Sequence, residues 1–526
     1  MRVLPPFSFL PPTLSSDTVI QFSVFLALTA LVALVTWLHC RKAVRSTDST
    51  REYFLANSGL NWVFIAGSIT LTNISTDTFV GMSGAQKVNI AWWELSGAVG
   101  LLLLATLFLP VYYRYKCTTV TELLERRYQN KNIRATVATV FLVGNIFLFL
   151  PAMLYTSGLV MKNMFALGDT LLGLNTIFVI GVSIAIVGAA YAIFGGLRAV
   201  AISDTYCGVI VFALGLTLVF MGLNAVGWDF SGLPPERLRL LGGPNDPIPW
   251  PTLLTGMVFS QLFYWSTNQT ITQRALAAPS LAEARRGVYL ALVIRVLLVP
   301  AMVVIPGLCA FKLYGPIGDA SYGRLVGDVL PRWLSGAFAA AMFAAVMSSY
   351  NSVLNSSAAL YVCDLHQRYV NKDGNIVRLT VIISVAFAAV SIGLMPIYMG
   401  SASIIATIQE VLGLFSMPIL SAFIVGLLFQ NVDARAVIAT VAFGALLYGS
   451  LTFGWNQLYS AHPETVAKPW HFLHLMCLTV AACVAFALTL NRVGFRRRAV
   501  FGFAVDLPSP AAESPAVTMP RARADQ

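Results

Sequence analysis

A run of polar residues interrupts an apolar stretch near residue 73. The segment 69–84 reads Ile-Thr-Leu-Thr-Asn-Ile-Ser-Thr-Asp-Thr-Phe-Val-Gly-Met-Ser-Gly. A helix that breaks there frees backbone carbonyls to bind a cation, as discontinuous transporter helices do. Ser and Thr can instead bond to the carbonyl four residues back and merely bend a helix, but a carboxylate such as Asp77 costs about 3 kcal/mol at bilayer depth. We interpret the run as a functional site.

A second run, at 260–269, combines polar and aromatic residues as Ser-Gln-Leu-Phe-Tyr-Trp-Ser-Thr-Asn-Gln. Aromatic rings that also carry hydrogen-bond donors suit a sugar pocket, because their faces cover C–H surfaces and their polar tips reach hydroxyls. Such rings also form belts at membrane interfaces. Both interpretations stay open for this run alone.

Further polar groups lie in apolar surroundings. The hydroxyl pair Ser348 and Ser349 offers oxygen ligands for a small cation such as Na⁺, although small residues also let helices pack closely. The ionisable residues Glu94, Asp204, Arg295 and Glu410 also fall in or beside apolar stretches. A charge at membrane depth is expected to face the helix bundle or a wet cavity, which makes each a candidate site.

The composition says which elements must position these groups. The chain has 526 residues, 57% of them apolar and 11% charged, which excludes a cytosolic enzyme. No basic cluster suggests a nucleic-acid partner, and neither the seven cysteines nor the five histidines have metal-ligand spacing. The bilayer is therefore the expected solvent of an all-α polytopic membrane protein.

Apolar stretches bounded by charge, Gly or Pro predict about thirteen transmembrane helices. The polar runs fall in the second, seventh and ninth of them. The predicted spans are 19–39, 60–84, 91–113, 134–162, 173–194, 199–226, 252–273, 287–313, 333–363, 376–399, 402–429, 434–455 and 470–491.

The basic residues predict the orientation. We number each loop by the span before it. The odd-numbered loops, ending with the segment 492–498, carry 22 of the 34 Lys and Arg residues, and the other side carries nine. The positive-inside rule then places the N-terminus outside and the C-terminus in the cytoplasm of a multi-pass plasma (inner) membrane protein. The Pro-rich N-terminus does not resemble a cleaved signal peptide, and the tail after Arg498 is expected to be disordered.

The polar interruptions of the second and seventh spans are five spans apart. Two five-helix units that begin on even and odd spans have opposite topology, which is what an inverted repeat requires. The site is then expected near the midplane between two broken helices, and alternating access is the expected mechanism.

Four motifs, read in order, resemble the sodium/solute symporter family, and in particular its sodium/glucose-galactose branch. They start at Asn73 (Asn-Ile-Ser-Thr-Asp-Thr-Phe-Val-Gly-Met-Ser-Gly), Gly195 (Gly-Gly-Leu-Arg-Ala-Val-Ala-Ile-Ser-Asp), Tyr264 (Tyr-Trp-Ser-Thr-Asn-Gln-Thr-Ile-Thr-Gln-Arg-Ala-Leu-Ala-Ala) and Ser348 (Ser-Ser-Tyr-Asn-Ser-Val-Leu-Asn). The resemblance implies a LeuT-type core of two inverted five-helix repeats. The implied transport core is 53–430, with repeats at about 60–226 and 252–429. Residues 1–52 would carry a peripheral first helix, residues 431–498 two further peripheral helices, and residues 499–526 a tail.

The resemblance also implies a sodium site. Its ligands would be backbone carbonyls and the two serine hydroxyls, and an acidic residue would lie on the cytoplasmic exit route of the ion. The implied ligands are Leu71, Ile74, Ala345, Ser348 and Ser349, and the implied exit residue is Asp204.

For the solute, the sugar branch implies a set of hydroxyl-binding side chains, Asn73, Thr78, Glu94, Gln261, Tyr264 and Gln409. Tyr264 would be the inner gate, and Met82 and Trp93 would lie on the outer side. The chain departs from the branch at Thr78 and Gln261, and it has Val296 where the branch has Lys. Arg295 is one residue away, a step that turns a helical side chain by about 100°. Asp77 and Arg295 are candidate substrate or structural charges.

The function so predicted is sodium-coupled import of a small hydrophilic solute, with a galactose-like or glucose-like sugar favoured. Another polyol, or a small organic anion held by Arg295, is the alternative for the solute. An uncoupled solute sensor on the same fold is the alternative from another class. Na⁺ is the expected coupling ion, with no organic cofactor, no enzymatic activity and no obligate protein partner.

Overall fold

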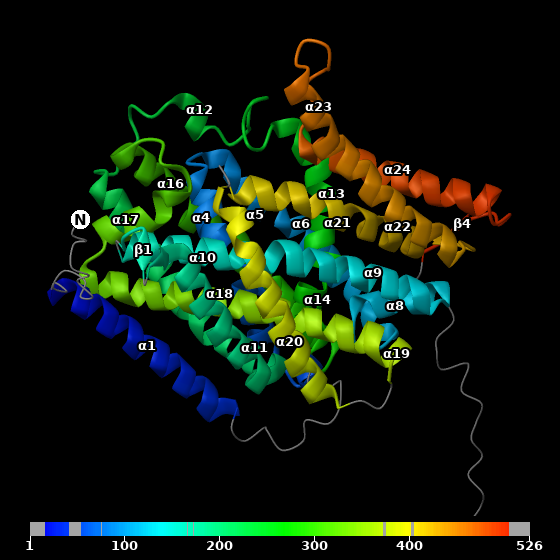
Figure 1. The fold of residues 1–526 in the computed structure, drawn as a ribbon, viewed down its shortest axis with the longest axis horizontal. Coiled ribbons are helices and arrows are strands. Elements are labelled where there is room, and N and C mark those ends of the chain that lie inside the picture. The colour runs from blue at the N-terminus through cyan, green and yellow to red at the C-terminus, as the bar shows by residue number, and fades with distance from the viewer. Residues whose placement is uncertain are drawn as a thin grey trace, which may run out of the picture.

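The computed structural model describes residues 16–40, 54–74, 76–165, 167–171, 173–371, 375–400 and 404–503. In these ranges the chain is predominantly helical (Figure 1), which confirms the predicted all-α class. The strands found there form two short antiparallel pairs, β1 (Thr170–Leu171) with β2 (Leu174–Asn175) and β3 (Phe429–Gln430) with β4 (Val500–Phe501). Helices dominate because a backbone in lipid must satisfy its polar groups within the segment.

The first half of the chain follows the first six predicted spans. The second span is broken between α3 and α4, and the third and fourth contain π-helical turns, η3 and η4, which are frequent at functional sites. The bounds are α1 Ser16–Cys40, η1 Ala56–Ser58, α3 Trp62–Thr72, α4 Thr76–Gly84, η2 Val88–Ala91, α5 Trp92–Leu95, α6 Gly97–Leu103, η3 Leu104–Phe108, α7 Leu109–Arg114, α8 Val120–Tyr128, α9 Lys131–Gly144, η4 Asn145–Phe149, α10 Leu150–Met164 and α11 Thr176–Ala225.

The second half follows the remaining seven spans. The seventh is broken between α13 and α14, and the eighth is divided into α15 and α16. The bounds are α12 Pro235–Leu238, η5 Trp250–Leu254, α13 Gly256–Leu262, η6 Phe263–Thr267, α14 Gln269–Leu276, α15 Leu281–Leu297, α16 Val299–Tyr314, η7 Gly318–Ala320, α17 Ser321–Val329, α18 Arg332–Ala359, η8 Leu360–His366, α19 Gln367–Tyr369, α20 Ile376–Leu394, η9 Met395–Gly400, α21 Ile404–Leu428, α22 Ala434–Gly449, η10 Ser450–Gly454, α23 Trp455–Ala461 and α24 Phe472–Val493.

Within the described ranges, nine helices are long and apolar enough to cross a membrane. Three shorter apolar helices, in α1, α3 and the first part of α11, coincide with the first, second and fifth predicted spans. The broken α13–α14 segment is the seventh span. Each of the thirteen predicted spans therefore has a helical counterpart. The second and seventh spans are too short for the count because each is interrupted.

The helix α11 has 50 residues and covers the fifth and sixth spans. At 1.5 Å per residue a straight helix of this length would reach about 75 Å, more than twice a bilayer core. Its start packs on α10, where a Cβ on Gly158 would lie 2.5 Å from the Ile177 carbonyl oxygen, and its end packs beside Leu325 of α17. Because α10 itself contacts α17, both ends of α11 lie at the same end of the bundle. The helix therefore turns back and supplies two spans.

If the chain crosses the membrane thirteen times, odd-numbered loops lie on one side and even-numbered loops on the other. The contacts between loops follow this division. Among the odd-numbered loops, Arg368 pairs with Glu125, and the Arg127 guanidinium donates to the carbonyl of Gly426, near the end of α21. Even-numbered loops contact one another through the ion pairs Lys87–Asp246 and Lys312–Asp229. This alternation is the observed counterpart of the predicted topology.

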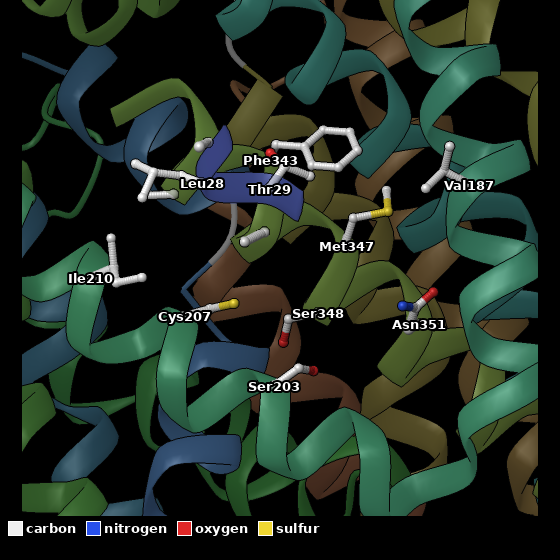
Figure 2. Close-up of a pocket in the computed structure, with 13 residues that line it drawn as sticks. Leu28, Thr29, Val187, Ser203, Cys207, Ile210, Phe343, Met347, Ser348 and Asn351 are labelled. Carbon is white, nitrogen blue, oxygen red and sulfur yellow. The ribbon is translucent and has the colours of Figure 1, made fainter. Parts of the chain in front are cut away.

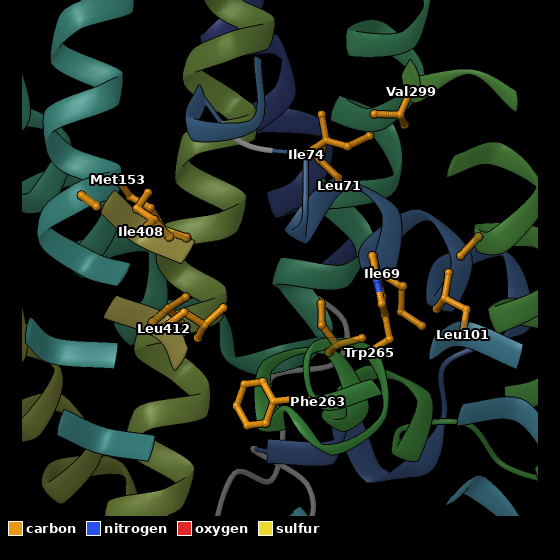
Figure 3. Packing of buried hydrophobic residues seen from close by; sticks show 14 of the residues in the cluster. Ile69, Leu71, Ile74, Leu101, Met153, Phe263, Trp265, Val299, Ile408 and Leu412 are labelled. Atoms are coloured by element: carbon orange, nitrogen blue, oxygen red, sulfur yellow. The ribbon is translucent and has the colours of Figure 1, made fainter. Parts of the chain in front are cut away.

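Helices α1 and α22–α24 lie on opposite sides of the bundle (Figure 1). Between them, buried apolar side chains from both broken spans pack with α10 and α21, and Figure 3 shows Leu71 and Ile74 with Phe263, Trp265 and Ile408. Residues 1–15 and 504–526 lie outside the described residues. Of the predicted tail, 499–526, the structure therefore describes only residues 499–503. The described part of that tail includes β4, which pairs with β3 at the end of α21.

Candidate functional site

The second span breaks after Thr72. Asn73 ends α3, its N–H bonds to the Thr70 carbonyl, and the Ile74 N–H bonds to the Leu71 carbonyl at 3.1 Å. The helix resumes at Thr76 as α4, and the Thr78 hydroxyl donates back to the Asn73 carbonyl at 3.1 Å. The polar run thus produces a break rather than a bend. Ser75 and the side chain of Asp77 lie outside the described residues.

The seventh span breaks at Asn268. After the π-helical turn η6, Asn268 is extended (φ −72°, ψ 124°), and its side chain caps α14 by accepting from the Thr270 N–H at 2.9 Å. Glycines of α6 let this segment approach closely, because a Cβ on Gly100 would lie 2.5 Å from the Gln261 carbonyl oxygen. The two breaks meet where the Tyr264 hydroxyl hydrogen-bonds the Asn73 amide.

A cavity of about 60 Å³ lies between the two breaks, and we call it the central pocket. All the residues predicted to bind the solute or to form its gates line this pocket, and so does Arg295. These residues are Asn73, Thr78, Met82, Trp93, Glu94, Gln261, Tyr264, Arg295 and Gln409. The remaining lining residues, which sequence reasoning missed, are Phe149, Ser260, Trp265, Ile405, Ile408 and Leu412. Trp265 lies in the polar-aromatic run, which was the available signal for it.

Arg295 reaches the central pocket although it is displaced by one residue from the expected basic position. Its guanidinium forms an ion pair with Glu94, and the two side chains are only 2% and 5% exposed. It lies 4.7 Å from the ring centre of Trp265, and the Asn73 amide, turned with its oxygen toward Arg295, accepts from its Nη atoms at 2.7 and 3.0 Å. The long side chain compensates for the displacement.

The remaining amides complete the wall of the central pocket. Gln261 donates from Nε2 to the Trp93 carbonyl at 2.8 Å and accepts from Trp265 Nε1 at 2.8 Å. Two atoms are left without a partner, Gln409 Oε1 and Arg295 Nε. One acceptor and one charged donor are therefore available to a bound hydroxyl group.

Beside the first break, Thr72 connects α3 with α18, α11 and α14. Its carbonyl accepts from the Ser349 hydroxyl at 2.9 Å, and its hydroxyl contacts Ser352 at 3.1 Å. The same hydroxyl accepts from Arg274 Nε at 2.8 Å and lies 3.4 Å from Asp204 Oδ2. We call these residues, with Ser68 and Ser348, the Thr72 cluster.

The Thr72 cluster suits a small hard cation, which prefers oxygen ligands. Ser68 donates to Asp204 Oδ2 at 2.6 Å, but Asp204 Oδ1 is buried without a partner. Ser348 lies beside Asp204, and its hydroxyl makes no hydrogen bond of normal length. Ala345, three residues earlier on α18, shares the helix face of Ser348. Sequence reasoning did not select Thr72, Ser68, Ser352 or Arg274 as site residues, because isolated hydroxyls in apolar helices are common.

A larger cavity of about 470 Å³, the vestibule, opens at the even-numbered loops. Trp93 and Ile405 line both the vestibule and the central pocket, so they separate the two. Asp319 also lines the vestibule and accepts from the N–H of Ile404, the first residue of α21, at 3.1 Å.

Two broken helices facing each other around a buried polar pocket define a membrane transporter of the inverted-repeat type. Solved structures show the same fold. The substrate-bound outward-open Na⁺-coupled sialic acid symporter aligns with a TM-score of 0.72 at 16% identity, covering 90% of this chain and 98% of that one. Mhp1, a nucleobase-cation-symport-1 family transporter, aligns with a TM-score of 0.52 at 15% identity, over 86% of this chain and 96% of that one.

The chain belongs to the sodium:solute symporter family, whose profile matches residues 53–444. It is 33% identical over 491 residues to the uncharacterized symporter YidK of Escherichia coli, covering 90% of this chain and 83% of YidK. It is 28% identical over 472 residues to the sodium/glucose cotransporter of Vibrio parahaemolyticus, 82% of this chain and 84% of that protein. The sodium/myo-inositol cotransporter 2 of Mus musculus is 28% identical over 84% of this chain and 72% of its own length. The protein is thus a sodium-coupled solute symporter and not an enzyme.

Proposed function

We propose that this symporter imports a neutral sugar or a related polyol. The observation that carries the proposal is the central pocket, which gathers Glu94, Gln261, Gln409 and Asn73 beside the rings of Trp93, Tyr264 and Trp265. Amides and a carboxylate bind hydroxyls, and aromatic faces cover the C–H surface of a sugar ring. The names of the glucose and myo-inositol cotransporters among the relatives agree with this class of solute.

The charge of the central pocket favours an uncharged solute. Glu94 and Arg295 neutralise each other, so a solute with a net charge would enter a low-dielectric site without a counter-ion. A small organic anion is the second candidate, because Arg295 Nε has no partner. To bind the guanidinium fully, however, a carboxylate would have to displace Glu94.

For sodium, the proposal assigns the carbonyls of Leu71, Ile74 and Ala345 and the hydroxyls of Ser348 and Ser349 as ligands, with Asp204 on the exit route. The unpartnered oxygens of Ser348 and Asp204 support this assignment. One charge crossing 100 mV releases about 2.3 kcal/mol. At about 1.4 kcal/mol per tenfold, the membrane potential alone sustains roughly fifty-fold accumulation of the solute.

The gates follow from the order of the cavities. Trp93, which lines both cavities, and Met82, which lines the central pocket, are assigned as the gate toward the vestibule, and Tyr264, hydrogen-bonded to Asn73, as the gate on the other side. Alternating access then requires that Trp93 and Ile405 separate when the vestibule side opens, and that the Tyr264–Asn73 bond breaks when the opposite side opens. Asp77, on α4, is assigned no role.

The proposed topology places the odd-numbered loops in the cytoplasm and the vestibule outside. The contacts among odd-numbered loops support a common side for the residues that carry most of the positive charge. The proposed core is 53–430, with repeats about 60–226 and 252–429. Residues 1–52 and 431–498 carry peripheral helices, 499–526 form a cytoplasmic tail, and the protein resides in the plasma (inner) membrane.

The test is uptake into proteoliposomes of labelled galactose, glucose, inositol, proline, pantothenate and a sialic acid, with an inward Na⁺ gradient or with K⁺ in its place. We expect sodium-dependent uptake of a neutral sugar or polyol, and loss of it in the Ser348→Ala, Ser349→Ala double variant. If only a carboxylate is taken up, the assignment of the sodium site stands, and Arg295 is reassigned as the residue that recognises the solute. Uptake of sugar that is unchanged without sodium, or solute binding without flux, would contradict the coupled mechanism and favour a sensor or leak pathway.

A further inference from the structure

A second cavity lies between α1, α11 and α18 (Figure 2), and it shares no described lining residue with the central pocket. Its volume is about 120 Å³, and its walls are mostly apolar, with Leu28 from α1, Ile210 from α11 and Met347 from α18. We call it the lateral cavity. On two of the helices that form it, α1 and α11, the side chains Leu26 and Val209 are 62% and 68% exposed. In the described part of the chain, the lateral cavity shares no lining residue with the vestibule and lies among apolar helices.

One region of the lateral cavity is polar. Ser203, Ser348 and Asn351 line it there, while Leu28 and Phe343 lie at the opposite side of the view (Figure 2). The Ser203 hydroxyl donates to the Val200 carbonyl at 2.9 Å and is satisfied. Asn351 has 0% exposure, and neither Oδ1 nor Nδ2 has a partner. A buried amide without partners is costly, so this side chain indicates a missing ligand with both a donor and an acceptor.

We propose that the lateral cavity binds an uncharged membrane amphiphile, of the class of long-chain alcohols, whose hydroxyl bonds to Asn351. The apolar walls match an alkyl chain, and the bilayer is where such a molecule is concentrated. A hydroxyl both donates and accepts, which is what the Asn351 amide requires. No basic side chain lines the lateral cavity among the described residues, so an ionised carboxylate or phosphate head would be buried there without a counter-charge.

The lateral cavity also connects to ion binding, a step that rests on the proposed function. Ser348 lines the cavity wall and is one of the two hydroxyls assigned to sodium. A hydroxyl bound at Asn351 lies one helical turn from Ser348, where it competes with the ion for that side chain. The amphiphile and sodium should therefore weaken each other's binding, and this effect is reciprocal.

Photolabelling tests the site without transport. The full chain is reconstituted in phosphatidylcholine vesicles that contain a long-chain primary alcohol with a diazirine beside its hydroxyl end, and labelled peptides are identified by mass spectrometry. Labels are expected on the segments around Leu28, Cys207 and Met347, with competition by unlabelled alcohol. The corresponding carboxylic acid at neutral pH should label these segments at least about tenfold less. Equal labelling by the acid, or labels spread evenly over all lipid-facing helices, would overturn the proposal.

Two matched variants locate the effect. Thr29→Phe fills the lateral cavity from α1, whereas Thr106→Phe places the same ring on another lipid-facing helix. Both threonines bond back to the carbonyl four residues earlier, at 2.8 and 2.7 Å, so the helix loses the same bond in each. We expect labelling to fall about tenfold in Thr29→Phe only. Equal labelling in both variants would refute the site even if sodium-driven uptake is intact.

The link to sodium is measured by titrating labelling with Na⁺, with K⁺ as control. Sodium should reduce the labelling severalfold, and Ser348→Ala should remove this reduction while labelling persists. Labelling that is insensitive to sodium in a preparation that shows sodium-driven uptake would contradict the competition. Labelling intact in a preparation without sodium-driven uptake would instead count against the proposed function.

Discussion

Two buried pairs of a carboxylate and an arginine lie near the breaks of this transporter, and they are arranged differently. In the central pocket Glu94 and Arg295 contact each other directly. In the Thr72 cluster no ion pair joins Asp204 to Arg274 among the described side chains, and the Thr72 hydroxyl stands between them, 2.8 Å from Arg274 Nε and 3.4 Å from Asp204 Oδ2. All four side chains are at most 5% exposed.

The difference agrees with the proposed division of the two regions between solute and ion. A direct pair cancels its own charge, so the central pocket presents hydrogen bonds without a net field and suits a neutral molecule. The separated pair leaves Asp204 Oδ1 without a partner beside Ser348. An uncompensated carboxylate oxygen in a low-dielectric region attracts a cation strongly. In the proposed assignment, the interposed Thr72 hydroxyl therefore distinguishes the sodium region from the solute pocket.

Breaking the direct pair should have the largest effect. Glu94→Gln leaves the Arg295 charge buried without its partner, which costs about 3–5 kcal/mol. We expect uptake to be lost and the temperature of thermal unfolding to fall. The double variant Glu94→Gln, Arg295→Met removes both charges and should recover most of the stability but not the uptake, as measured by unfolding in detergent and uptake in vesicles.

The exposed pair Arg324–Asp328 provides the control, because both side chains are 55% exposed. Asp328→Asn should change stability by less than about 1 kcal/mol. If the double variant is no more stable than Glu94→Gln alone, the charge balance of the central pocket is not what stabilises it.

The separated pair is tested by Thr72→Val, which keeps the shape and removes the hydroxyl. Arg274 and Asp204 then lose their bridge, and the sodium concentration for half-maximal uptake should rise about tenfold, the effect of roughly 1.4 kcal/mol. The solute KM at saturating sodium should stay unchanged. Thr70→Val is the matched control, because the Thr70 hydroxyl is buried in the same helix without a partner. A shift in solute KM with constant sodium dependence would contradict the division of roles.

A smaller effect is expected at Trp265, on the solute side of the comparison. Trp265→Phe keeps an aromatic ring but removes the donor to Gln261 and weakens the contact with the Arg295 guanidinium. The loss of about 1 kcal/mol corresponds to roughly a fivefold higher solute KM. Sodium dependence should not change. A variant that alters sodium activation instead would show that the two regions are not separate.

The sequence predicted those features of the fold that depend on residue types alone, namely the membrane spans and the two helix breaks. Apolar length gave the spans, and the polar runs at 69–84 and 260–269 predicted both helix breaks, because unpaired polar groups in lipid must be satisfied or used. The residues proposed for the central pocket do line one cavity. Their roles in binding remain predictions, since a shared cavity does not measure affinity.

What could not be predicted depends on three-dimensional proximity. Thr72 and Ser352 are 280 residues apart in sequence and 3.1 Å apart in the fold. Arg295 pairs with Glu94 across 201 residues, although it is one residue from the position where the branch has Lys. The continuity of α11 could not be predicted either, because the residues around Gly195 and Gly196 indicated a boundary between two spans where the structure has one helix.

The smallest predicted effect concerns the vestibule, where pH should act on the gate rather than on either pair. Burial raises the pKa of Asp319 to about 6, although the Ile404 N–H that it caps acts in the opposite direction. A carboxyl with a raised pKa holds its proton more tightly in this closed arrangement than when hydrated. The closed vestibule side is therefore favoured below pH 6, and this preference is lost as the pH rises from about 4 to 6. A fluorophore on a vestibule cysteine should report more opening at pH 7 than at pH 5.

The other titratable groups of the vestibule are Asp246, Glu410 and His471. Burial lowers the pKa of His471 to about 4, so this ring stays neutral across the tested range. Lys87 holds the pKa of Asp246 below its usual value although burial acts against it, so this carboxylate stays ionised. Asp319→Asn keeps an oxygen to accept from Ile404 and removes the titrating proton, so it should abolish the pH dependence without loss of the cap. If the pH dependence persists in this variant, the titrating group is Glu410 instead. Glu410 lies on α21 beside Gln409, so the vestibule would then be linked directly to the central pocket.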